Sequence, residues 1–195
     1  MEPLSQRSTN LDTPEVTLDG QLREMYGRVA YSHKTHEKMA DRYTARHRFF
    51  KAVEILLSAT TTTSLLLAVF GDTHAGTVVG AVCSTILLGV TLYFKEASLA
   101  EKTQKHTDVA SKLWAVREAL LSLLVDLKDG RELAEVRGER DRINTALEAI
   151  YSVAPRTDGT AYVAAQNALK DAEELSFTDE ELDRILPRQL RKSSS

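Results

Sequence analysis

The most apolar part of the chain is residues 52–94, which contain no Lys or Arg and only two acids, Glu54 and Asp72. This stretch divides into two apolar segments and a short turn, which are residues 52–70, 75–94 and 71–74. A helix of about 20 residues is about 30 Å long, close to the thickness of the hydrocarbon core of a bilayer. The pattern therefore predicts a hairpin of two transmembrane helices.

A hairpin buried inside a soluble helical bundle is the alternative interpretation. The Ser and Thr residues at 60–64 make the first segment less apolar than a typical span. However, their hydroxyls can bond to the carbonyl four residues earlier, which lowers their cost in lipid. The second segment also lacks the polar stripe that a helix of a soluble bundle presents to water. We therefore favour the membrane interpretation.

Alternating spacings of four and three, as in a coiled coil, continue on both sides of the hairpin, mostly at apolar and ring-bearing residues. The first seam comprises Leu22, Tyr26, Val29, His33, His36, Ala40, Tyr43, His47, Phe50, Glu54 and Leu57. The second comprises Leu99, Lys102, His106, Val109, Leu113, Val116, Leu120, Leu123 and Leu127. A tight turn makes the two long helices antiparallel neighbours, so the numbers of facing residues should sum to about 145. This count places His36 opposite Val109.

Three shorter helices are predicted after Gly130: one that Pro155 closes, one from about residue 159 to 175, and one that Thr178 caps with Glu181. No segment shows the alternation of a strand, so the predicted fold class is all-α, a membrane hairpin extended into a cytoplasmic helical bundle. The predicted organisation is a disordered tail 1–18, a juxtamembrane helix 19–51, the hairpin 52–94, cytoplasmic helices 95–154, short C-terminal helices 155–187 and a disordered tail 188–195.

Composition and charge narrow the function. The net charge is −3 over 195 residues, which argues against a general nucleic-acid binder. The one cysteine, Cys83, excludes a disulfide scaffold and lies within an apolar segment. No phosphate-binding loop, zinc-protease motif or nucleophile elbow occurs. The sequence therefore predicts neither an enzyme nor a cofactor.

The distribution of Lys and Arg predicts the orientation in the membrane. Residues 27–51 carry seven of them before the hairpin, Lys95 and Lys102 follow it, and the turn has none. Because cytoplasmic flanks are enriched in Lys and Arg, both termini should be cytoplasmic.

Four histidines lie on the two seams: His33, His36, His47 and His106. They form a polar layer that would fix helix register, act as a pH switch or bind a metal. Glu37 is expected to point off the seam, which leaves no acidic ligand in phase. We therefore favour the register role and predict no metal.

A basic stripe, Lys34, Lys38, Arg42, Arg46 and Lys51, follows one side of the first long helix. It would contact anionic lipid or bind an anionic ligand such as a nucleotide. The alternative is a solvated helix face that satisfies the orientation rule.

Inside the first apolar segment, Glu54, Ser58, Thr61 and Thr62 fall roughly on one side of the helix. An acid in a transmembrane helix is costly, so these residues are candidates to line a water-filled path in an oligomer. In the alternative, Glu54 reaches the interface or pairs with Lys51.

The second apolar segment carries small residues four apart, Gly76, Gly80 and Ser84. Such spacing allows close helix packing, either within the hairpin or between subunits.

The stretch Tyr31-Ser32-His33-Lys34-Thr35-His36-Glu37-Lys38, leading into a two-helix hairpin and a long helix, resembles the SLATT family of bacterial conflict systems. The resemblance covers roughly residues 21–186. It implies a homo-oligomeric effector that forms or gates a pore in the inner membrane in an antiphage, abortive-infection response. It also implies a nucleotide second-messenger synthase or sensor protein acting in trans. A membrane-anchored scaffold that binds a cytoplasmic partner is the alternative function.

Overall fold

A computed structural model describes residues 17–71 and 74–192, and every regular element in those ranges is helical. The elements are α1 (Leu18–Phe70), α2 (His74–Ala97), α3 (Leu99–Lys128), α4 (Leu133–Val153), α5 (Gly159–Lys170), α6 (Asp179–Ile185) and a 3-10 turn, η1 (Arg188–Leu190). The prediction of an all-α chain with two long apolar helices is confirmed.

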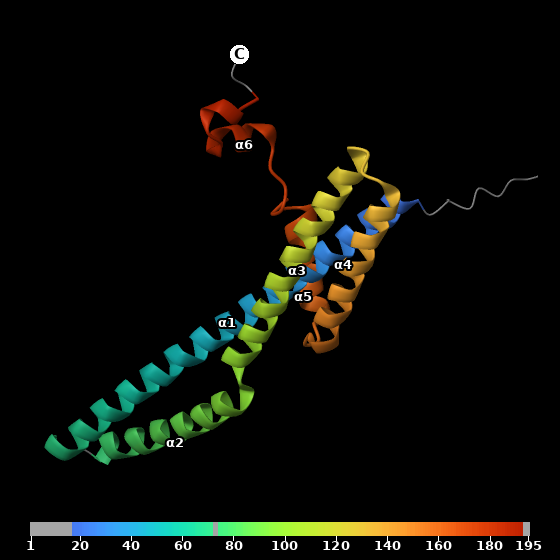
Figure 1. Cartoon of the computed structure of the whole chain (residues 1–195). Coiled ribbons are helices and arrows are strands. Elements are labelled where there is room, and N and C mark those ends of the chain that lie inside the picture. Colours follow the sequence, from blue (N-terminus) through green and yellow to red (C-terminus); the bar gives the residue numbers. More distant parts are fainter. Residues whose placement is uncertain (1–16, 72–73, 193–195) are drawn as a thin grey trace, which may run out of the picture.

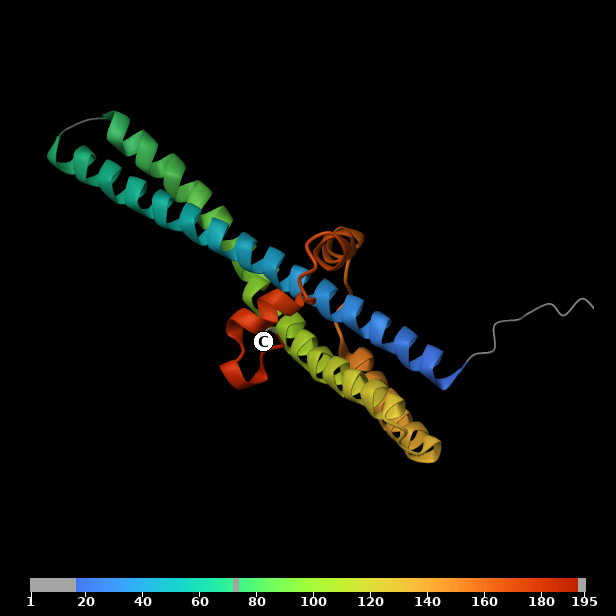
Figure 2. The ribbon, with the colours of Figure 1, turned by 90° about the horizontal axis from the view of Figure 1, so that it is seen from above.

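The long helix α1 runs through both parts of the molecule (Figure 1). Its C-terminal half pairs with α2 in an antiparallel hairpin, and its N-terminal half packs against α3 and α5. The helix α4 packs on α3 (Figure 2). The molecule is therefore a hairpin at one end and a helical bundle at the other.

Local sequence explains the length of α1. Thr17 caps its first turn by accepting a hydrogen bond from the Gly20 amide at 3.1 Å. No proline follows within the helix, so nothing in it removes a backbone donor before Gly71. The juxtamembrane helix and the first apolar segment are therefore one element of 53 residues.

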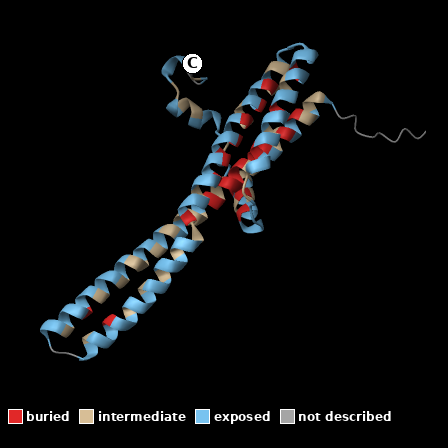
Figure 3. Ribbon diagram, turned by 60° about the horizontal axis from the view of Figure 1, so that its bottom comes forward, coloured by how far each residue is buried: buried red, intermediate tan, exposed pale blue. Residues whose placement is uncertain are grey.

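The hydrophobic core lies in the bundle and not in the hairpin (Figure 3). Its buried side chains come from α1, α3 and α4, and most occupy the predicted seams. They are Leu22, Met25, Val29, Val109, Leu113, Val116, Leu120, Leu123, Val136, Ile143 and Ile150.

The second long helix is not continuous. At Ser98 the backbone has φ 46° and ψ 41°, the left-handed region, and this separates α2 from α3. Ser98 is neither Gly nor Pro, so its residue type gives little warning of the break. The break redirects the chain where the hairpin meets the bundle, and Leu99, directly after it, is buried.

The helix predicted to reach about residue 175 ends at Lys170. Glu173 has a left-handed φ of 47°, and the Glu174 amide turns back to the Ala168 carbonyl at 3.0 Å. Such a closure satisfies helix-end carbonyls that continuing the helix would otherwise satisfy.

The structure describes only part of the two tails that the sequence predicts to be disordered. Residues 1–16 of the predicted N-terminal tail lie outside the described residues. Residues 188–192, predicted to be disordered, include η1 and are fastened to α6. The Lys192 amide donates to Asp183, and its ammonium group pairs with Asp179 at 2.9 Å.

Candidate functional site

The hairpin exposes its apolar side chains instead of burying them. Only 6% of the most apolar window of either long helix is buried, although both windows are long and apolar enough to cross a membrane. Phe70 is 84% exposed and Leu56 is 68% exposed. A soluble protein rarely leaves so large an apolar surface in water. The surface therefore fits contact with lipid and opposes the soluble-bundle alternative.

Of the three small residues predicted to pack in the membrane, Gly80 lies in the interface of the hairpin. It is buried, and a Cβ atom added there would lie 3.3 Å from Leu65 Cδ2 and 3.5 Å from Ser64 Cβ. Gly76 is half-buried and Ser84 is exposed. Close packing inside the hairpin thus uses Gly80.

The polar side of the first span adjoins the helix–helix interface. Thr61 is half-buried, whereas Ser58 and Thr62 are exposed. Thr61 and Thr62 donate to the carbonyls of Leu57 and Ser58 at 2.8 and 2.9 Å, the back-bonding expected of hydroxyls in lipid.

Glu54, the acid of this group, has a partner on its own helix. Its side chain is 30% exposed and lies 3.4 Å from Lys51 Nζ. The geometry provides the ion pair considered in the sequence, and Glu54 stays at the edge of the polar side of the span.

Three of the four seam histidines are buried between α1 and α3. His36 Nδ1 lies 2.9 Å from His106 Nδ1, and His33 Nδ1 lies 2.9 Å from the Ala110 carbonyl oxygen. The His33 ring therefore donates from Nδ1 to that carbonyl. The His36–His106 bond requires one ring to donate and the other to accept, so both cannot be protonated.

Burial holds this histidine pair in the uncharged form. Burial, reinforced by the charges of His106 and His33, lowers the pKa of His36 from 6.5 to about 4. Burial also lowers the pKa of His106, although the charge of Asp158 opposes it. At neutral pH the pair is a neutral hydrogen-bonded contact between α1 and α3.

His47 lies at the membrane end of the same seam. Its ring packs on Phe94 with centroids 4.8 Å apart, and Phe50 packs on Tyr93 at 5.5 Å. His47 Nδ1 is buried without a hydrogen-bond partner in the described part of the chain. An aromatic layer thus lies at the cytoplasmic end of the hairpin, next to the bundle.

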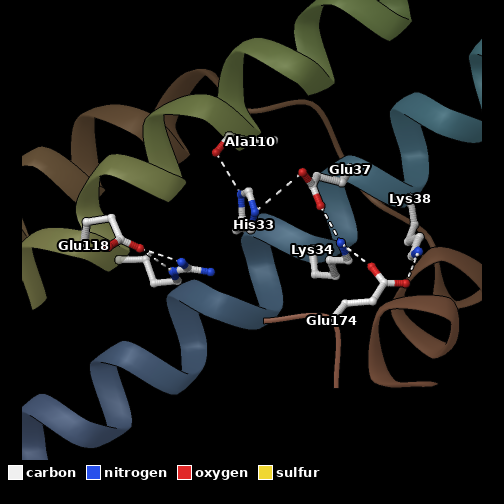
Figure 4. A network of polar contacts seen from close by, with 8 residues as sticks. His33, Lys34, Glu37, Lys38, Ala110, Glu118 and Glu174 are labelled. Atoms are coloured by element: carbon white, nitrogen blue, oxygen red, sulfur yellow. Dashed lines mark hydrogen bonds and ion pairs between the residues drawn. The ribbon is translucent and has the colours of Figure 1, made fainter. Parts of the chain in front are cut away.

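Glu37 flanks the seam with its side chain 39% exposed, but its carboxylate comes close to a seam histidine. Its Oε1 lies 3.6 Å from His33 Nε2, and its Oε2 lies 2.7 Å from Lys34 Nζ (Figure 4). The i and i+4 positions of one helix bring the acid beside the ring. Among the described residues no cluster of three or more His, Cys, Asp or Glu could hold a metal.

The N-terminal part of the basic stripe forms ion pairs with acids from the C-terminal segments. Lys34 is buried and lies 2.5 Å from Glu174, which Lys38 also contacts at 3.1 Å (Figure 4). Arg42 Nη1 donates to both carboxylate oxygens of Asp158 at 2.7 Å. Arg46 and Lys51 are exposed nearer the membrane. Lys34, Lys38 and Arg42 therefore dock the α5 segment on α1.

These contacts shift the pKa of the paired groups. Burial alone would lower the pKa of the Lys34 ammonium group. Its hydrogen bonds to Glu174 and Glu37 outweigh this effect and raise the pKa. Hydrogen bonds from Lys34 and Lys38 lower the pKa of Glu174. A hydrogen bond from the Ala161 amide and, to a smaller extent, one from Arg42 lower the pKa of Asp158. Ion pairing therefore stabilises the docked segment at neutral pH.

Sequence reasoning missed Glu174 and Asp158 as partners of the stripe. Asp158 carried one usable signal, because an Asp directly before a helix is a frequent N-cap, and here it accepts from the Ala161 amide at 2.8 Å. Glu174 carried none, since its position depends on the unforeseen end of α5.

Comparison with known protein families gives a match over most of the chain. No curated protein and no solved structure matches the chain. One family model does, and it matches residues 18–181, from the first residue of α1 into α6. Its description, a 2TM effector domain, agrees with the exposed two-helix hairpin. The chain therefore belongs to the SMODS and SLOG-associating 2TM effector domain family 4 (SLATT_4).

Proposed function

We propose that the protein is a membrane effector that assembles into oligomers and forms or gates a pore in the inner membrane of a bacterial cell. The family name supports a two-span effector that acts with SMODS or SLOG proteins. A nucleotide second-messenger synthase or sensor would supply the trigger in trans. The pore would kill an infected cell or halt its growth. The chain itself would catalyse no reaction.

The observation that carries this proposal is that the exposed surface of the hairpin has an apolar side and a polar side. Most of its surface is apolar, but Ser58 and Thr62 are exposed beside the hairpin interface, with Glu54 one turn before Ser58. In a ring of hairpins, the apolar faces would meet lipid and this polar side would meet water. The threonine hydroxyl oxygens keep acceptor capacity toward that water after donating to the backbone.

Self-association has support outside the membrane. Trp114, Leu121 and Val125 are 51%, 44% and 50% exposed on α3. Their spacing of seven and four places them on one stripe of the helix, apart from the stripe that faces the core. A second copy of this helix would cover the stripe, as in a coiled coil.

The proposed orientation places the helix bundle and both ends of the chain in the cytoplasm. Seven Lys and Arg lie in residues 27–51 and none in the turn between α1 and α2. The basic residues of α1 nearest the hairpin, Arg46, Arg48 and Lys51, are exposed. They would meet anionic headgroups on the inner face.

The ion pair between Glu54 and Lys51 favours a second candidate function. If Glu54 only neutralises Lys51 at the interface, the hairpin is an anchor, and the bundle acts as a scaffold for a cytoplasmic partner. The two functions differ in whether the polar side of α1 is needed.

We expect a variant with Glu54→Leu, Thr61→Val and Thr62→Val to release dye from liposomes at least about tenfold more slowly than the wild type, because the polar lining is gone. Toxicity on overexpression should fall in parallel. A matched control is Thr60→Val with Thr63→Val, which changes the same residue type on other sides of the helix. Equal release by all three proteins, or none by the wild type with or without its partner, would favour the scaffold.

A further inference from the structure

A pocket of about 440 Å³ lies on the bundle where the loop between α4 and α5 crosses α1. It combines Tyr31, Ser32 and His36 of α1 with Tyr151, Arg156 and Tyr162. This volume is in the range of small-molecule sites. None of its ring or arginine side chains belongs to the hairpin.

Local sequence builds the pocket from three segments. Pro155 follows the end of α4, and Asp158 caps the start of α5, so the connection is short. The Arg42–Asp158 ion pair fixes this loop to α1. Tyr151 and Tyr162, on the two flanking helices, are thereby brought to the same part of α1.

The tyrosines form an aromatic wall. Tyr31 and Tyr162 have ring centroids 6.0 Å apart and planes 28° apart, and the Tyr151 hydroxyl lies 3.0 Å from Ser32 Oγ. Tyr151 and Tyr162 are 43% and 50% exposed. Their exposed ring surfaces are available to a flat aromatic ligand.

Charge in the pocket comes from Arg156. Among the described residues, none that lines the pocket carries a carboxylate. The acid nearest in sequence, Asp158, is occupied by Arg42, and Arg156 has no ion pair within residues 17–71 and 74–192. An exposed guanidinium beside aromatic rings is suited to a phosphate or carboxylate group.

We infer that this pocket binds a small organic anion with a flat ring, whose ring packs on the tyrosines and whose anionic group pairs with Arg156. A nucleoside monophosphate has this chemistry and a suitable size. The inference goes beyond pore formation, because it concerns the bundle and holds whether or not the hairpin conducts. His36 connects the pocket to the contact between α1 and α3.

The test is equilibrium dialysis of the purified full chain in detergent against three probes: adenosine monophosphate, adenosine and inorganic phosphate. We expect the monophosphate to bind more tightly than either fragment, since only it offers both groups. Arg156→Gln should weaken the monophosphate about tenfold, the usual effect of losing one charge-assisted hydrogen bond, and leave adenosine unchanged. Tyr162→Leu should weaken both, whereas Tyr162→Phe should keep the binding.

Arg137→Gln is the matched control, because Arg137 is exposed on α4 outside the pocket. It should bind the monophosphate as the wild type does, and thermal unfolding should show that every variant is folded. No binding of the monophosphate at millimolar concentration would overturn the inference. Equal binding of monophosphate and phosphate, or an unchanged affinity in Arg156→Gln, would also overturn it. Because dialysis in detergent does not measure conduction, a failure here leaves the pore proposal standing.

Discussion

Replacing Leu120 with alanine should lower the free energy of unfolding of the cytoplasmic bundle by about 2 to 5 kcal/mol. Leu120 is 0% exposed and belongs to the core cluster of α1, α3 and α4. Truncation removes buried methyl groups and leaves a cavity that a packed core closes only partly. Urea unfolding in detergent, followed by circular dichroism, measures the loss.

The neighbouring Leu121 gives a matched control. It has the same side chain on the same helix but is 44% exposed, so Leu121→Ala should change the unfolding free energy by less than about 0.5 kcal/mol. If the stripe on α3 joins two copies, Leu121→Ala should instead weaken self-association. Similar destabilisation by the two substitutions would show that the core is not where the structure places it.

Acidification should destabilise the bundle between about pH 6.5 and pH 4 through the His36–His106 pair. The pKa of His36 is about 4 in the folded protein and near 6.5 once unfolded, so the unfolded chain binds more protons in this window. The stabilising contribution is complete above pH 6.5 and is lost as the pH falls. A shift of this size corresponds to on the order of 3 kcal/mol.

The measurement is the urea midpoint of unfolding as a function of pH, for the wild type and for His36→Leu. The leucine removes the buried titrating ring, so its midpoint should change less across the window. His74→Gln is the control, because His74 is exposed at the start of α2. A wild-type midpoint that stays constant from pH 6.5 to 4, or an undiminished slope in His36→Leu, would contradict the buried neutral pair.

Hydropathy and seam spacing were sufficient to predict the hairpin and the core of the bundle. Counting residues from the turn was accurate inside the hairpin, where Gly80 contacts Leu65. Beyond Ser98 it holds to within about one helical turn, since His36 hydrogen-bonds His106 and His33 contacts the Ala110 carbonyl. The count assumed one uninterrupted helix, whereas the left-handed residue at Ser98 separates α2 from α3.

The docking of the C-terminal segments could not be predicted from the sequence. The basic stripe was visible as a spacing of four, but the acids that dock on it, Glu174 and Asp158, lie more than a hundred residues from their partners. Their positions depend on where α5 ends and on how the loop before it crosses α1. Charge pattern alone could not distinguish a surface for an external anion from one that binds the chain's own carboxylates.

The most direct test of the account is labelling of single cysteines in intact cells with a membrane-impermeant maleimide. In a Cys83→Ala background, His74→Cys places a thiol beside the turn and Lys128→Cys places one at the exposed end of α3. We expect the thiol at 74 to react from outside, whereas the thiol at 128 should react only after the cells are permeabilised. Reaction at 128 in intact cells, or recovery of the protein in the soluble fraction without detergent, would contradict a two-span hairpin with its bundle in the cytoplasm.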